Sequence, residues 1–172
     1  MKLRFATILC AFAAIFSMAS CTEEILGVGE LPPLAGEVVL TDVVDAGAVR
    51  LSPNYVFTLE LKSAAGDVLE AKLASSSTAL AAGTYTEASP AYAVAGNFIT
   101  GAEGTKLTVG GETHLVTAGT ITVAAEGGNY SLEAIVKLDN GSNYSLTWAG
   151  GPVSWGEVLV ATKLNTVMHT QV

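Results

Sequence analysis

The sequence predicts an all-β fold, an antiparallel β-sandwich or barrel of about eight or nine short strands. Three observations predict it. From residue 37 onward apolar and polar residues alternate with a period of two, as in strands with one buried face. Nearly every gap between the apolar runs contains glycine, which favours turns. One segment, residues 129–148, has the pattern of a complete β-hairpin.

The first pair of strands is predicted within residues 55–73. Apolar residues occupy alternate positions from Tyr55 to Leu61. The other face of this strand carries residues 56, 58, 60 and 62, of which the last two are Glu60 and Lys62. A turn at residues 64–67 then reverses the chain. Residues 68–73 return with Leu69, Ala71 and Leu73 on one face.

Residues 74–82 are too small and polar for an amphipathic helix, although a short helical turn fits them. Further short strands are predicted at residues 84–87, 97–100, 106–109, 114–117 and 120–124.

The hairpin at residues 129–148 has two possible registers. A two-residue loop at Asn140-Gly141 would put the apolar residues of the two strands on opposite faces. A three-residue loop, residues 139–141, puts them all on one face, so the second register is predicted. Its pairs are Val136 with Tyr144, Ala134 with Leu146 and Leu132 with Trp148. This loop requires a positive φ at Gly141, which glycine adopts at little cost.

The first twenty residues have the order of a cleaved secretory signal helix. Lys2 and Arg4 precede a twelve-residue apolar run, residues 5–16, and small residues follow it. A helix that crosses a bilayer needs about 20 apolar residues, so this run is short for a membrane span.

The positions of the two cysteines support a secretory leader and indicate lipidation at Cys21. Cys10 lies in the leader, which leaves Cys21 as the only cysteine of the mature chain. A lone cysteine cannot form an internal disulfide in a secreted protein. A lipid thioether would account for it, because several acyl chains anchor a protein firmly where one does not.

Met18-Ala19-Ser20-Cys21 resembles the bacterial lipobox, which usually has leucine in its first position. Glu23 and Glu24 are similar to the acidic export signal of surface lipoproteins of the Bacteroidota; they also fit a solvated tether. The succession of AAGTYT, AGTITV and GGNYSLEAIVKLDNGSNYSLTWAG, at about residues 80–150, resembles small all-β surface lipoproteins of gut Bacteroidota. This resemblance implies a fold class and a location at the outer membrane, with display on the cell surface, and it implies no functional residues.

The predicted organisation is a signal peptide at residues 1–20, a lipidated cysteine and flexible tether at 21–36, and one all-β domain at 37–172. Pro32-Pro33 favours an extended tether. After the leader, six basic residues remain against 16 acidic ones, and the basic residues are scattered. This charge argues against nucleic acid as a partner, and the expected partners are the membrane, through the lipid on Cys21, and a glycan or another surface protein.

The residues that could carry catalysis or bind metal do not have the spacings of known catalytic or metal-binding motifs. His114 and His169 are far apart and lack a metal-ligand spacing, so no metal or other cofactor is expected. Ser154 lacks the spacing of a nucleophile elbow. Residues 139–143 are rich in oxygen ligands, but their glycine comes too early for an EF-hand loop. The sequence therefore predicts a protein that is not an enzyme.

Two functions remain open. The first is a non-enzymatic structural, adhesive or assembly role for a lipoprotein that is surface-exposed or faces the periplasm. The second is a glycan- or ligand-binding accessory lipoprotein of a nutrient-uptake system. Trp155, in a glycine-rich loop, would stack on a sugar in the second case, or it caps the core. Tyr144 is the other candidate contact, although its position on the apolar face of the hairpin first indicates the core.

Overall fold

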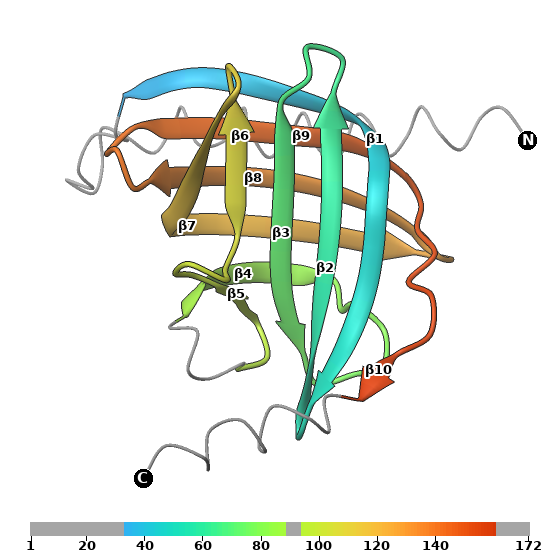
Figure 1. Ribbon diagram of the computed structural model, residues 1–172. Helices are drawn as coiled ribbons and strands as arrows, with labels where there is room; N and C mark the ends of the chain where they lie inside the picture. The colour runs from blue at the N-terminus through green and yellow to red at the C-terminus, as the bar shows by residue number, and fades with distance from the viewer. Residues whose placement is uncertain (1–32, 89–93, 161–172) are drawn as a thin grey trace, which may run out of the picture. The chain divides into compact units, whose positions relative to one another are not determined.

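Ten strands of one mixed sheet form the part of the chain that the computed structural model describes, residues 33–88 and 94–160 (Figure 1). No helix occurs among these residues, so the prediction of an all-β fold is confirmed. The predicted signal helix, Cys21 and most of the tether lie outside the described residues, as does His169. The strands are β1 (Leu34–Leu51), β2 (Asn54–Ser63), β3 (Val68–Ser75), β4 (Gly83–Ala88), β5 (Asn97–Ile99), β6 (Lys106–Val109), β7 (Glu112–Glu126), β8 (Asn129–Leu138), β9 (Asn143–Pro152) and β10 (Leu159–Val160).

The pairings of these strands close in a ring. β1 pairs with β2, β2 with β3, and β7, β8 and β9 follow one another as antiparallel neighbours. The ring closes on one side because β9 pairs with β1. On the other side β6 pairs with both β3 and β7, and β5 and β4 make a second connection between the same two strands.

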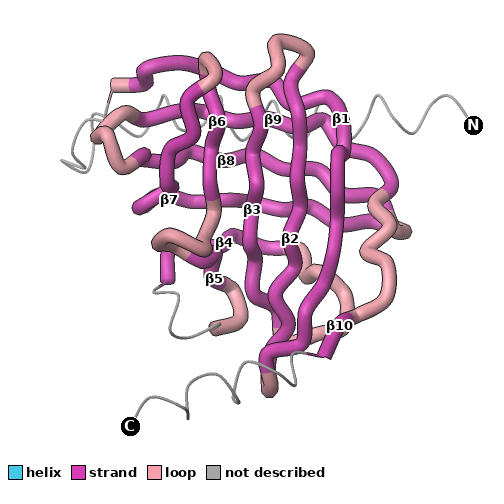
Figure 2. The backbone as a smooth tube through the Cα atoms, in the orientation of Figure 1, coloured by secondary structure: helices cyan, strands magenta, loops and turns pink. Residues whose placement is uncertain are grey.

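The ring is flattened into two layers that pack face to face, as in a sandwich. Figure 1 shows β2, β3, β6, the start of β7 and the second half of β1 in front, crossing over the rest of β7, β8, β9 and the first half of β1. The tube view in Figure 2 shows the same crossing and the long course of β1 through both layers. The side chains between the layers form the core.

β1 passes from one layer to the other at a corner. Its residues from Leu34 to Leu40 pair in parallel with β9, and those from Leu40 to Leu51 pair with β2. Two register shifts, between Leu40 and Asp42 and between Val43 and Asp45, lie at this change of partner. Bulges bend a strand and increase its twist, which lets a single strand serve two crossing layers.

β7 makes the second corner. Its register against β8 shifts between Val116 and Ala118, and Gly119 then has a φ of +127°. A Cβ at residue 119 would clash with the carbonyl oxygen of Ile135 on β8. The prediction of separate strands at 114–117 and 120–124 is therefore wrong: glycine there bends one continuous strand instead of ending it.

The core contains large aliphatic and aromatic side chains from both layers. The alternating residues predicted for the first strand pair are buried from Phe57 onward, since Phe57, Leu61 and Leu69 are each 0% exposed, while Tyr55 is partly buried. The largest side chains that are almost fully buried are Phe57, Phe98, Leu40, Leu59, Leu61, Leu69, Leu73, Leu107, Ile121, Leu132, Leu138 and Leu146.

The predicted hairpin register is confirmed. β8 and β9 pair Val136 with Tyr144, Ala134 with Leu146 and Leu132 with Trp148. Gly141 has a φ of +87°. Its backbone N–H donates to the carbonyl oxygen of Leu138 at 2.9 Å, as the three-residue loop requires.

Two features differ from the sequence prediction. The sheet is mixed and not purely antiparallel, because β1 pairs in parallel with β9 and β10, and β4 pairs in parallel with β5. β1 also begins at Leu34, inside the segment assigned to the tether. Parallel partners lie far apart in the chain, so no local pattern reveals them.

Candidate functional site

Trp155 contacts both layers of the fold. Its ring packs edge-to-face on Phe57 of β2, with ring centroids 5.1 Å apart, and on Tyr130 of β8 at 5.5 Å. Edge-to-face packing is a favourable geometry for aromatic rings. Of the two sequence interpretations of Trp155, the structure therefore supports the core cap, and contact with a ligand stays a prediction.

The segment that carries Trp155 links β9 to β10, and we call residues 153–160 the strap. In Figure 1 the strap leaves the end of β9 and runs down beside β1 to β10. Val153 packs against the core together with Trp155. The strap thus covers the end of the core where Phe57 and Tyr130 lie.

The indole N–H of Trp155 has an unusual environment. Its Nε1 atom is buried, and it has no hydrogen-bond partner among the described residues. A buried donor without an acceptor costs free energy, commonly about 1–3 kcal/mol. The indole ring therefore makes favourable contacts with aromatic rings at this position, while its N–H group makes no hydrogen bond with the described residues.

Tyr144 occupies the opposite end of β9. It is half-buried, packs against the core and lies opposite Gly36 of β1. A Cβ on Gly36 would come within 3.0 Å of the Tyr144 ring, so the ring covers the glycine backbone closely. The second candidate contact therefore has a packing role as well.

The structure does not bring Tyr144 and Trp155 together. Tyr130, which contacts Trp155, pairs with Gly151 near the end of β9. Tyr144 lies seven residues before Gly151 on the same strand, a distance of roughly 20 Å at the rise of an extended chain. A single monosaccharide could not contact both rings.

His114 is placed between two carboxylates. Its Nδ1 atom lies 3.1 Å from Oδ1 of Asp139, and its Nε2 atom lies 3.7 Å from Oε2 of Glu112. A hydrogen bond with the backbone of Leu115, together with the His114 contact, holds the pKa of the Asp139 carboxyl below its usual value. The two carboxylates lie against different ring nitrogens, and the described residues contain no group of three or more metal-ligand side chains suited to an ion.

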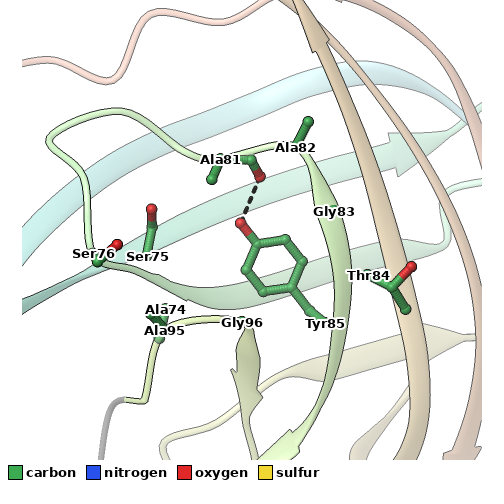
Figure 3. Close-up of a pocket in the computed structure, with 10 residues that line it drawn as sticks. All are labelled: Ala74, Ser75, Ser76, Ala81, Ala82, Gly83, Thr84, Tyr85, Ala95 and Gly96. Carbon is green, nitrogen blue, oxygen red and sulfur yellow. Dashed lines mark hydrogen bonds between the residues drawn. The ribbon is translucent and has the colours of Figure 1, made fainter.

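A pocket of about 220 Å³ lies between the end of β3 and the start of β4 (Figure 3). Alanine, glycine and serine form most of its wall, and no charged side chain lines it. The Tyr85 hydroxyl donates a hydrogen bond to the carbonyl oxygen of Ala81 at 2.6 Å. Burial, and to a lesser degree repulsion from Tyr130, raises the pKa of Tyr85 to about 12. The pocket thus offers one aromatic hydroxyl that is already engaged.

Sequence reasoning missed the double contact of Trp155 and the pocket beside Tyr85. Both depend on residues brought together from distant strands, and no local spacing indicates them.

Ser154, exposed on the strap, has no hydrogen-bond partner among the described residues. The described part of the chain also contains no helix of the length and apolar character that a membrane span needs.

Comparison with known proteins gives no match: no protein-family model, no curated protein and no solved structure is significantly similar to this chain.

Proposed function

We propose that this protein is a lipoprotein, anchored to the outer membrane through Cys21, whose β-domain has a non-enzymatic structural, adhesive or assembly role at the cell surface. One observation carries the proposal. Cys21 follows a basic end, an apolar run and small residues, and it is the only cysteine left once that leader is removed.

The spacing between Cys21 and the domain supports this arrangement. β1 begins at Leu34, so a short segment separates the lipid site from the first strand. That segment contains Gly27, Gly29 and Pro32-Pro33, residues typical of a linker. A tether of this length would keep the domain near the membrane surface while leaving its outer faces free.

The domain itself is suited to a structural role. The ring of strands is closed on both sides, and loop contacts reinforce it. Asp67, in the turn between β2 and β3, accepts a hydrogen bond from the backbone N–H of Gly110, in the turn between β6 and β7. The bond holds these two turns together, so this edge of the domain presents a fixed surface to a partner, and a preorganised surface favours recognition.

Ligand binding through Trp155 is the alternative, and its geometry is less favourable. Trp155 packs on Phe57 and Tyr130, and Tyr144 lies at the other end of β9. Affinity electrophoresis of the whole protein in gels that contain glycans tests this alternative. A glycan that retards the wild type but not the Trp155→Ala variant would favour it over the structural role.

Metabolic labelling with an alkyne-bearing fatty acid tests the lipid anchor. Wild-type protein should incorporate the label, and the Cys21→Ala variant should lose at least about nine-tenths of it. Cys10→Ala is the matched control, because it removes the leader cysteine and should leave labelling intact. Equal labelling of wild type and Cys21→Ala, or no labelling of the wild type, would overturn the proposal.

A further inference from the structure

The strap is weakly attached to the rest of the domain. Within the described residues, which end at Val160, β10 pairs with β1 at two positions, Val49 with Leu159 and Arg50 with Val160. Outside that pairing, the strap's backbone hydrogen bond runs from the Val153 N–H to the carbonyl oxygen of Gly128, at a long 3.4 Å. By contrast, β8 pairs with neighbours on both sides along almost all its length.

Apolar side chains at the far end of the strap lie in solvent. Leu159 is 65% exposed and Val158 is 37% exposed, so they contribute little burial to its attachment. Trp155, together with Val153, supplies the contacts with the core. Among the described residues, the strap is therefore held mainly by its start, at Val153, and by the Trp155 ring.

The same ring carries the feature that favours release. The buried Nε1 atom of Trp155 lacks a hydrogen-bond acceptor among the described residues. When the ring leaves the core, this N–H gains water as a partner, which offsets part of the lost apolar burial. Segments with few pairings and a polar penalty are those that open below the free energy of global unfolding.

We propose that the strap is a displaceable plug that opens while the ring of β1 to β9 stays folded. Opening withdraws Trp155 from between the layers and uncovers Phe57 and Tyr130, which are 0% and 8% exposed when it is closed. The strap thereby controls access to an aromatic surface at one end of the domain. This proposal concerns the β-domain alone and does not depend on the lipid anchor.

The experiment follows Trp155 and the sheet separately during urea unfolding of the full-length protein as purified from its cells. The chain has two tryptophans, so Trp148→Phe leaves Trp155 as the only indole. We expect Trp155 emission to shift to the red at lower urea concentrations than those at which far-UV circular dichroism changes. Coincident transitions would overturn the proposal.

A disulfide tests whether the first transition is the strap. Val49 and Leu159 are cross-strand partners, a geometry compatible with a bridge, so Val49→Cys with Leu159→Cys should lock β10 to β1. Oxidation should merge the two transitions, and reduction should separate them again. Peptide mapping identifies which sulfurs are joined, whatever the state of Cys21.

A second bridge serves as the control. Glu133 on β8 and Thr147 on β9 are also partners, in the hairpin that should stay folded. A bridge between Glu133→Cys and Thr147→Cys should leave the early Trp155 transition in place. If both bridges abolish that transition, or neither does, the strap is not a separate opening unit.

Discussion

Leu132 on β8 lies directly opposite Trp148 on β9, and both side chains point into the core, with 1% and 3% of their surface exposed. This pairing depends on the three-residue loop at the end of the hairpin. A two-residue loop would slip the register by one residue and turn one apolar face outward.

The loop predicts the effect of replacing Gly141. A side chain at its φ of +87° is strained, so Gly141→Ala should lower the free energy of unfolding by about 1 kcal/mol, measured by urea denaturation. Gly47→Ala is the control, because it has open space around it and no positive φ. It should change stability by less than about 0.5 kcal/mol. Equal losses in the two variants would contradict the proposed strain at the loop.

Gly119, at the β7 corner, should be far less tolerant of substitution. Two effects disfavour a side chain there: the φ of Gly119 is +127°, and an added Cβ would clash with the carbonyl oxygen of Ile135. Gly119→Ala should therefore cost roughly 3 kcal/mol in thermal or urea unfolding. Gly127 also has a positive φ but open space, so Gly127→Ala isolates the backbone term, about 1 kcal/mol. Equal losses of stability in Gly119→Ala and Gly127→Ala would contradict the requirement for glycine at the β7 corner.

Thr105 joins three parts of the sheet. Its side chain is 0% exposed, and its hydroxyl oxygen accepts a hydrogen bond from the backbone N–H of Lys72 on β3. Its backbone bonds to Ile99 of β5 and Val116 of β7. Thr105→Val leaves the Lys72 N–H without a partner and should cost about 1–3 kcal/mol by urea denaturation. Thr105→Ser keeps the hydroxyl and should lose less than Thr105→Val; the opposite order would show that the hydroxyl is not the important group.

Asp139 should contribute a pH-dependent term to stability. Hydrogen bonding with the backbone of Leu115, and then with His114, lowers its pKa from 3.8 in the folded state. A group with a lowered folded pKa stabilises the fold above its unfolded pKa, and that contribution is lost as pH falls through the folded pKa. Wild-type protein should therefore lose more stability than Asp139→Asn as pH falls below about 4.

The measurement is the urea midpoint as a function of pH for both proteins. Glu126→Gln, at the exposed end of β7, removes a carboxylate without touching His114 and serves as the control. A wild-type curve parallel to that of Asp139→Asn throughout the acid range would contradict this contribution.

Part of this fold follows from local pattern. The register of β8 with β9 could be predicted because alternation fixes the buried face and Gly141 fixes the loop. The β2–β3 pair followed from the same rule. β7 was divided wrongly because Ala118-Gly119 has the composition of a turn, while the close approach of Ile135 that makes glycine necessary is visible only in three dimensions.

The site was harder to predict than the fold. Trp155 has the same local sequence whether it stacks on a sugar or caps a core, since its partners Phe57 and Tyr130 lie on strands far away in the chain. The parallel pairing of β1 with β9 likewise joins the first long strand to one of the last. Such contacts arise from topology, which a single sequence does not contain.

The central claim, a lipid thioether at Cys21, is tested most directly by mass spectrometry of the N-terminal peptide from protein purified from its native membrane. The account predicts that the peptide begins at Cys21 and carries diacylglycerol on the sulfur. A free thiol at Cys21, or residues 1–20 still attached, would contradict it.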